Sequence, residues 1–282
     1  MSFRTADGLD AALQKLVFES KTAFDWLIEG VDRKEPITFV PNPGNIGDAL
    51  INLACFAYLA SRFADVRLCA ISDVPQTECV FVGGGGNLVE PLYKNIANFL
   101  AGLKRAHRLF LFPSTVQGYE SLLKPLAPRL RCLCRESVSL AYMQSVLGPE
   151  KVRIAHDSAF MLGPQLRAAF PRRVAKMPPQ RCLSFRNDRE RAVARSGGID
   201  IMGQYQTGWD DVALMRQAIQ GASTYLLGFG EVHTDRLHCA ILSAILGRQT
   251  VLFANSYFKN RAVFELSLSR LPNTRFAQDY QE

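Results

Sequence analysis

Short apolar runs alternate with longer segments of helical periodicity along this chain, and this alternation constrains the fold more than any other feature. The runs of strand character are residues 37–40, 66–70, 79–82, 109–112, a segment ending near 134, 152–155, 181–185, 199–202, 224–227 and 250–254. Helices are expected at 8–30, 49–62, 93–103, 138–147, 209–219, 234–246 and from about 259. Such alternation predicts an α/β fold in which parallel sheets carry helices on both faces.

The periodicity breaks at residues 163–180, where four prolines and several cationic residues lie together. A stretch of this kind is typical of a connection or a loop. Strand and helix patterns restart after it. We therefore predict two α/β domains, 1–165 and 166–282, that face each other across a cleft; a single elongated α/β domain is the alternative.

The net charge of +7 is by default a property of a solvated basic surface, and the functional alternatives are an anionic substrate, the face of an anionic membrane and nucleic acid. Nucleic acid ranks last because no helix-turn-helix, zinc finger or aromatic-rich RNA motif is present. The seven cysteines form no CxxC pair and stand mostly in apolar surroundings, which is typical of small buried side chains in a reducing compartment. We predict no metal site, because the four histidines show no ligand spacing with the cysteines.

The N-terminal residues lack the basic and then apolar pattern of a signal peptide, since acidic and basic residues interrupt them. No apolar run approaches the roughly 20 residues that a membrane span requires. We expect a cytoplasmic protein, and its charge allows a peripheral contact with the inner face of the plasma membrane.

Two glycine-containing loops follow predicted strands, at the strand ends where α/β proteins bind ligands. In the loop 42–48, Asn45 and Asp48 can bond the loop, cap the next helix or line a site. The run of four glycines that leads into Asn87 is neither a complete Rossmann fingerprint nor a P-loop. Four consecutive glycines are costly in chain entropy, which indicates that something approaches the backbone closely. Gly85, Gly86 and Asn87 are interpreted as a loop that binds a ligand, with a close helix–strand crossing as the alternative.

Polar residues also follow two later strands. Ser114 and Gln117 can bond sugar hydroxyls or phosphate oxygens, or can simply form a turn in the loop 113–118. Arg135 precedes Glu136 and Ser137, and Ser137 is the expected N-cap of the next helix. A cation at a helix start opposes the helix dipole, which favours a role for Arg135 in reaching an anion over an ion pair with Glu136.

The helix expected at 234–246 begins with the strongest pair of candidate residues. With Thr234 as N-cap, Arg236 and His238 stand in a first turn that has free N–H groups and a positive dipole. This arrangement predicts an anion site with an acid/base group beside it. Lys259, at the start of the last helix, is either a further cation of the site or a solvated lysine.

Four segments together resemble the polysaccharide pyruvyl transferase family, in order and spacing, across nearly the whole chain. They are Asn42-Pro-Gly-Asn-Ile-Gly-Asp48, the glycine run to Leu88, Arg135-Glu-Ser137, and Asp235-Arg-Leu-His238 leading to Ser256, Tyr257 and Lys259. Cys239 departs from the pattern, because many members have glycine after the histidine.

The resemblance implies a GT-B-like fold of two Rossmann-like domains and a reaction without a cofactor, in which phosphoenolpyruvate is the donor substrate. It also implies donor recognition by Arg135, Arg236, Leu237 and His238. The first segment looks closest to members that modify sugars of exopolysaccharide repeat units on a lipid diphosphate carrier.

Phosphoenolpyruvate carries a carboxylate and a phosphate, which suit arginines at a helix N-terminus. We hypothesise that Arg135 and Arg236 hold this donor while His238 removes the proton of the attacking sugar hydroxyl. His156, Asp157 and Glu136 are guesses for the group that protonates the methylene carbon. A GT-B glycosyltransferase that uses a nucleotide sugar is the first alternative, and a non-catalytic binder of phosphorylated metabolites or acidic glycans is the second.

Overall fold

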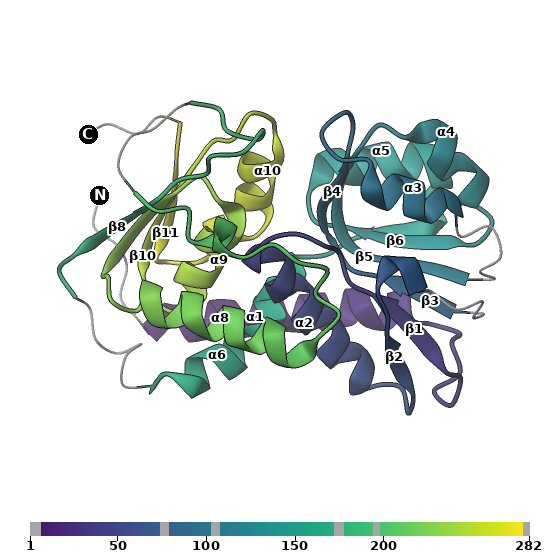
Figure 1. Cartoon of the computed structure of the whole chain (residues 1–282), viewed down its shortest axis with the longest axis horizontal. Coiled ribbons are helices and arrows are strands. Elements are labelled where there is room, and N and C mark those ends of the chain that lie inside the picture. The colour runs from purple at the N-terminus through teal and green to yellow at the C-terminus, as the bar shows by residue number, and fades with distance from the viewer. Residues whose placement is uncertain (1–6, 74–78, 103–107, 172–177, 194–197, 279–282) are drawn as a thin grey trace.

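Two parallel β-sheets, each flanked by helices, lie side by side along the long axis of the computed structural model (Figure 1). The structure describes residues 7–73, 79–102, 108–171, 178–193 and 198–278. Together the sheets form a mixed α/β architecture of two Rossmann-like halves, which is GT-B-like as expected.

The first sheet contains seven parallel strands among the described residues, in the order β2-β1-β3-β5-β6-β7, and β4 pairs beside β5. The strands are β1 (Ile37–Val40), β2 (Val66–Leu68), β3 (Cys79–Val82), β4 (Gly85–Val89), β5 (Arg108–Gln117), β6 (Leu130–Cys134) and β7 (Val152–Ile154). The helices of this half are α1 (Asp7–Leu27), α2 (Ile46–Ala60), α3 (Asn95–Gly102), α4 (Glu120–Leu123) and α5 (Ser137–Leu147).

The second sheet has the order β11-β10-β9-β8 and is also parallel. Its strands are β8 (Arg181–Ser184), β9 (Glu231–Thr234), β10 (Gln249–Phe253) and β11 (Thr274–Ala277). The helices of this half are α6 (Gly163–Ala169), α8 (Val212–Leu226), α9 (Leu237–Ile245) and α10 (Lys259–Leu266). The predicted division between residues 165 and 166 falls inside α6, and the division itself stays a prediction.

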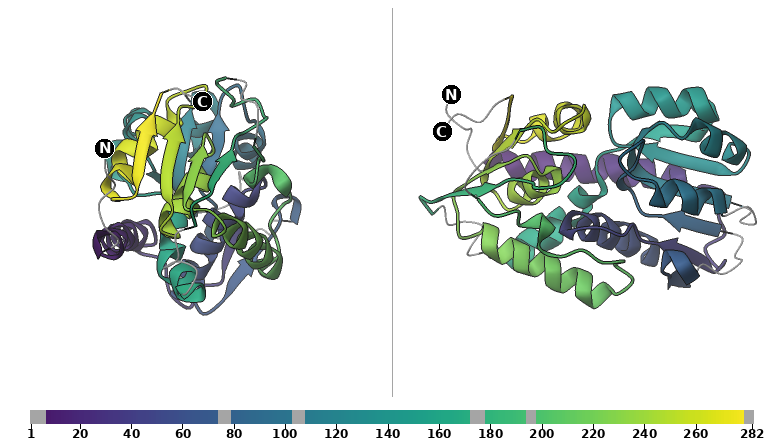
Figure 2. Two further views of the ribbon diagram at one scale, coloured as in Figure 1. Left: turned by 90° about the vertical axis from the view of Figure 1, so that its left-hand side faces the viewer. Right: turned by 45° about the horizontal axis from the view of Figure 1, so that its top comes forward.

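The two halves share one hydrophobic core, which holds them together. Helix α1 runs behind both halves (Figure 2). Phe24 of α1, Phe81 of β3 and Ile241 of α9 are fully buried members of the same cluster. Strands β1 and β3 are buried along their whole length, which explains why they are apolar without alternation. All seven cysteines are buried as free thiols, as predicted.

Several sequence-based expectations are wrong, because strands pair with distant segments or because a short apolar run does not distinguish a strand from a helix. Residues 113–117 are not a loop but the end of β5, because Ser114 and Gln117 pair with β4. The expected strand at 199–202 leads instead into a short 3-10 turn, Met202–Gln204. The expected strand at 224–227 is mostly the end of α8, since an apolar run of four residues fits either structure. Neither β9 nor β11 was anticipated.

Helix starts are also shifted from the expected positions. Thr234 ends β9 rather than capping α9, which has Arg236 at its N-cap position. Glu136, and not Ser137, caps α5 through hydrogen bonds from the Ser139 N–H to its carboxylate. The end of the helix expected at 93–103 lies outside the described residues. Within the described part of the chain, no helix has both the length and the apolar character needed to cross a membrane.

Candidate active site

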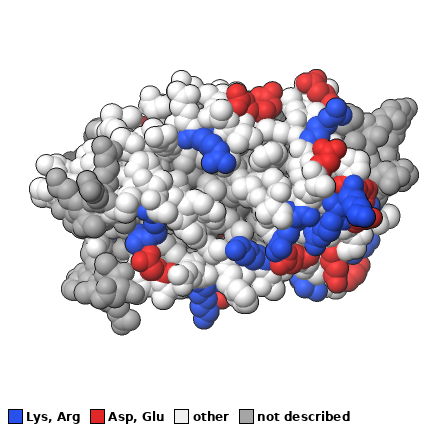
Figure 3. Space-filling view, turned by 90° about the horizontal axis from the view of Figure 1, so that it is seen from below, with Lys and Arg blue, Asp and Glu red and all other residues white. Residues whose placement is uncertain are grey.

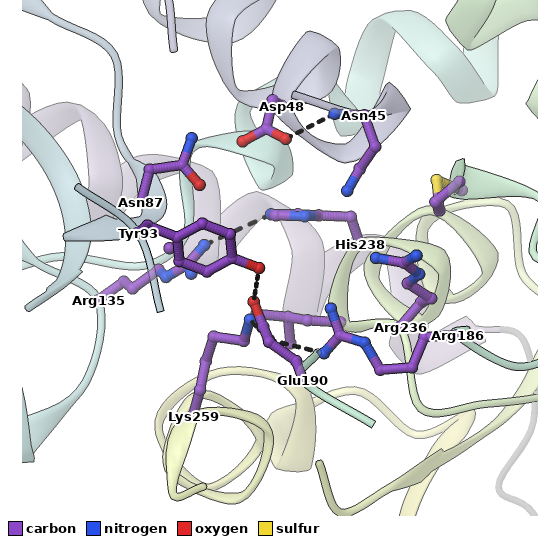
Figure 4. A pocket seen from close by; sticks show the side chains of 13 residues that line it. Asn45, Asp48, Asn87, Tyr93, Arg135, Arg186, Glu190, Arg236, His238 and Lys259 are labelled. Atoms are coloured by element: carbon purple, nitrogen blue, oxygen red, sulfur yellow. Dashed lines mark hydrogen bonds and ion pairs between the residues drawn. The ribbon is translucent and has the colours of Figure 1, made fainter. Parts of the chain in front are cut away.

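A polar cavity lies between the two halves of the molecule (Figure 4). The first half contributes Asn45, Asp48, Gly86, Asn87, Tyr93 and Arg135. The second half contributes Arg186, Glu190, Met202, Arg236, Leu237, His238 and Lys259.

Most of these residues come shortly after the carboxyl end of a strand. Gly86 follows β3, Arg135 follows β6, and Arg186, Arg236 and Lys259 follow β8, β9 and β10. Open parallel sheets place the loops after their strands along one edge, so the topology itself brings these distant residues to one cleft.

The first turn of α2 forms the upper wall of the cavity in Figure 4. Asn45 caps the helix by accepting a hydrogen bond from the Gly47 N–H at 2.7 Å, and Asp48 Oδ2 accepts from the Asn45 N–H at 2.9 Å. This reciprocal capping box fixes the turn. Burial raises the pKa of Asp48 to about 6, although His238, Arg135 and Lys259 oppose the rise.

A buried ion pair lies behind the cavity. Arg135 Nη1 donates to Asp157 Oδ2 at 2.6 Å, and Arg135 Nε donates to Thr115 Oγ1 at 2.9 Å. Burial alone would raise the pKa of Asp157, but His238 and Arg135 hold it well below its usual range. Asp157 therefore stays ionised and counterbalances the charge of Arg135.

The imidazole of His238 lines the cavity beside this ion pair. Its Nε2 lies 3.3 Å from Asp157 Oδ2 and 3.4 Å from Arg135 Nη1. The other edge of the ring packs on Gly47, where a Cβ would collide with Nδ1. A carboxylate next to the ring stabilises the imidazolium that forms when His238 accepts a proton.

Glu190 joins the two halves, and no sequence motif pointed to this residue. Its carboxylate accepts from Arg186 Nη1 at 2.6 Å, from Lys259 Nζ and from the Tyr93 hydroxyl at 2.7 Å. Burial alone would raise the pKa of Glu190, but the charges of Lys259 and Arg186 and the hydrogen bonds from Lys259 and Tyr93 together hold it well below its usual range. The position of Glu190 in the polar segment after β8 is the signal that could have identified it.

An anion cradle forms where Arg135 and Lys259 approach Gly86. A Cβ on Gly86 would lie 3.3 Å from Arg135 Nη2 and 3.5 Å from Lys259 Nζ. Among the described residues, Arg135 Nη2 is buried without a hydrogen-bond partner. Burial lowers the pKa of Lys259 to about 8, while Glu190 favours its charged form. Two cationic groups around an empty Cβ position can hold a carboxylate or a phosphate.

Arg236 is held mainly by carboxylates of its own half. Its Nε donates to Asp200 Oδ1 at 2.9 Å, Nη2 pairs with the other oxygen of Asp200, and Nη1 lies 2.7 Å from Asp188 Oδ2. Only the N–H groups of Arg236 that do not bind Asp188 or Asp200 are available to a ligand.

Nine of the twelve predicted site residues line the cavity, and Gly85, Ser114 and Gln117 do not. Gly85 has a φ of 127° and packs near Asp48, so it shapes the wall from behind. Ser114 donates to the Phe112 carbonyl within β5, and Gln117 is exposed at the end of that strand.

His156 lies outside the cavity, although it was one of three guesses for the proton donor. Its Nδ1 contacts Ser267 Oγ at 2.8 Å, and its Nε2 contacts Glu19 of α1 at 2.8 Å. His156 therefore ties α1 to the second half. Glu136, a second guess, caps α5. Within the described ranges, no group of three or more His, Cys, Asp or Glu side chains is placed to hold a metal ion.

Comparisons with known proteins agree with one another. The family described as "Polysaccharide pyruvyl transferase" matches residues 45–257. A curated relative from Bacillus subtilis (strain 168), "Putative pyruvyl transferase EpsO", is 21% identical over 307 residues, covering 92% of this chain and 93% of the relative. The crystal structure of a functionally uncharacterized protein from Klebsiella pneumoniae subsp. pneumoniae NTUH-K2044 has a TM-score of 0.78 and 29% identity, covering 92% of this chain and 99% of that one.

Proposed function

This chain belongs to the polysaccharide pyruvyl transferase family, and we propose that it moves the pyruvyl group of phosphoenolpyruvate onto two hydroxyls of a sugar, forming a ketal and releasing phosphate. The family and its EpsO relative establish a transferase that acts in polysaccharide biosynthesis. The donor, the acceptor and the roles of individual residues are the proposal.

The proposal that phosphoenolpyruvate is the donor rests on the anion cradle. Arg135 Nη2 has no partner among the described residues, and it lies with Lys259 Nζ around the missing Cβ of Gly86. A buried N–H group without a partner is costly, so a ligand oxygen at this point is favoured. Phosphoenolpyruvate offers both a carboxylate and a phosphate, which suit the two cationic groups of this cavity.

His238 is proposed as the base that accepts the proton of the attacking hydroxyl. The ring borders the cavity, within 3.4 Å of Arg135 Nη1, and is therefore close to the cradle. Asp157 stabilises the protonated ring, which lowers the barrier to proton transfer. Arg236 positions the first turn of α9 through Asp188 and Asp200, and its remaining N–H groups and Leu237 border the donor.

We also propose that the acceptor sugar belongs to an exopolysaccharide repeat unit on a lipid diphosphate, and that the protein contacts an anionic membrane surface. The net charge of +7 supports this contact. On the underside, basic side chains gather toward one end, interspersed with acidic ones (Figure 3). Binding to anionic vesicles at low salt that disappears at high salt would support the contact, and no binding to them at low salt would remove it.

The donor is tested by thermal unfolding with phosphoenolpyruvate, UDP-sugars and GDP-sugars, on the wild type and on Gly86→Ala. At 100 times its Kd, the true donor adds roughly 2.7 kcal/mol of stability. We expect phosphoenolpyruvate alone to stabilise the wild type, and Gly86→Ala to lose the effect because its methyl group fills the cradle. A response to a nucleotide sugar instead would assign the protein to nucleotide-sugar chemistry and overturn the proposal.

A further inference from the structure

Asp48 is a carboxyl side chain of the cavity that no cation pairs with among the described residues. Its Oδ2 accepts the Asn45 N–H, which is the one hydrogen bond of this carboxylate in the described part of the chain, so Oδ1 has no partner there. Figure 4 shows Asp48 on the wall opposite Arg135 and Lys259, with His238 between them. Oδ1 is therefore available to a ligand, and Oδ2 is the oxygen used for capping.

The other acidic groups of the site are poor proton donors. Asp157 and Glu190 are ionised. Asp157 accepts hydrogen bonds from Arg135 Nη1 and the Ala159 N–H, and Glu190 accepts from Arg186, Lys259 and the Tyr93 hydroxyl. The Tyr93 hydroxyl already donates its proton to Glu190. A group that protonates carbon must carry a proton when the donor is bound and must face the substrate. Asp48 lines the cavity, and burial raises its pKa to about 6, closer to neutrality than that of an ordinary carboxyl group.

We propose that Asp48 is the general acid that protonates the methylene carbon of the enolpyruvyl donor, an assignment that rests on the function proposed above. In the first step a sugar hydroxyl oxygen bonds to donor C2, and its proton passes to His238. The electron pair of the C2–C3 double bond takes the proton from Asp48 Oδ1. C3 becomes a methyl group and Asp48 becomes a carboxylate.

The second step restores both groups without any oxidant or other co-reactant. The second hydroxyl oxygen bonds to C2 as the bond between C2 and the phosphate oxygen breaks. The proton of this hydroxyl returns to Asp48, and His238 gives its proton to the departing phosphate. Two hydroxyl protons are lost overall; one hydrogen is gained by C3 and one by phosphate.

The electrostatic surroundings of Asp48 agree with this role. Burial raises its pKa to about 6, and the charges that oppose the rise are Arg135 after β6 and Lys259 of α10, together with His238 of α9 when its ring is protonated. An anionic donor bound at Arg135 and Lys259 screens two of these charges, so it raises the proton affinity of Asp48 further. Donor binding therefore favours the protonated carboxyl that the first step requires.

The test follows phosphate release and deuterium uptake in D₂O, with phosphoenolpyruvate as donor and with either 4-nitrophenyl hexopyranosides or water as nucleophile. The wild type should place one deuterium in each product methyl group. Asp48→Asn keeps an oxygen for the Asn45 N–H and thus the capping box, but it lacks the acidic proton. We expect it to lose roughly 10²–10⁴-fold in turnover and in deuterium uptake, with the Kd of phosphoenolpyruvate changed by less than about threefold.

Two further variants separate acid catalysis from helix capping. Asp48→Glu keeps the acid and should turn over faster than Asp48→Asn at similar donor affinity. Asp211→Asn alters an exposed aspartate that caps α8 away from the cavity, and it should keep the wild-type rate. Wild-type turnover by Asp48→Asn would overturn the assignment of Asp48 alone. A wild-type protein that releases no phosphate from phosphoenolpyruvate with any nucleophile would overturn the proposed function.

Discussion

Arg135 Nη1 donates to Asp157 Oδ2 at 2.6 Å, and both side chains are completely excluded from solvent. The pair couples the stability of the fold to the chemistry of the site, because the same guanidinium offers Nη2 to the cavity and the same carboxylate contacts His238. Changes to Asp157 should therefore affect both properties.

Asp157→Asn should lower the free energy of unfolding by about 3–5 kcal/mol, because it leaves the Arg135 charge buried without a counter-charge. Chemical denaturation checks this value. Glu120→Gln, in an exposed pair with Lys124, is the control and should change stability little. Equal effects of the two substitutions would contradict the structural role of the buried pair.

Acid should weaken the same contact. The pKa of Asp157 is below that of an unfolded aspartate, which is about 3.9. The stabilisation is therefore complete above that value and is lost as the pH falls below it, toward the folded-state pKa. Unfolding curves of the wild type and Asp157→Asn should thus converge as the pH is lowered below about 4.

His238→Ala should reduce turnover by roughly 10²–10⁴-fold through loss of the base, while most of the affinity for phosphoenolpyruvate remains at the cradle. Steady-state kinetics and calorimetric binding measure the two effects. His233→Gln is a suitable control, because His233 lies outside the cavity and contacts Glu231 at 2.7 Å. Near-normal turnover by His238→Ala would make the base assignment wrong.

Gly47→Ala should impair catalysis by displacing a neighbour. Its methyl group would collide with the imidazole of His238, so turnover should fall at least tenfold while α2 remains folded. Gly221→Ala, inside α8 with no atom within 4 Å of the new methyl group, should retain the rate and gain about 0.5–1 kcal/mol of stability. Steady-state kinetics measure the turnover of both variants, and thermal unfolding measures their stability. Wild-type turnover by Gly47→Ala would contradict the predicted displacement of His238.

Donor affinity should decline at alkaline pH. Burial lowers the pKa of Lys259 to about 8, so the ammonium that faces the cradle is lost as the pH rises through that value. The Kd of phosphoenolpyruvate should increase by up to tenfold per pH unit above about 8. Lys259→Arg keeps its charge and should flatten this dependence in titrations from pH 7 to 9.5; an unchanged slope would exclude Lys259 from donor binding.

Much of the fold follows from local patterns in the sequence. The buried runs Ile37–Val40 and Cys79–Val82 are strands at their predicted bounds. A short run of consecutive apolar residues is typical of a strand whose two faces are both covered in a parallel sheet. The loop at Asn45 and the residue Arg135 were identified because they follow predicted strands, and His238 and Lys259 because they stand at predicted helix starts. Parallel topology collects all of them at one edge.

Other features depend on partners far along the chain. Strand β4 exists because Gly85–Val89 pairs with the end of β5, about 29 residues away, and a glycine run by itself favours a loop. Arg236 was expected to face the donor, but Asp200 and Asp188 bind most of its guanidinium. Glu190 gains its role from Tyr93, Arg186 and Lys259, two of which lie at least 69 residues from it.

The sequence by itself thus determined the α/β class, the strand-end loops and the family, because periodicity, turn residues and short motifs are local properties. The tertiary structure decided which guanidinium nitrogen of the described residues is left without a hydrogen-bond partner, which acid is buried and which strands pair. Those outcomes depend on desolvation and on charge pairing between residues that meet only after the two halves have packed together.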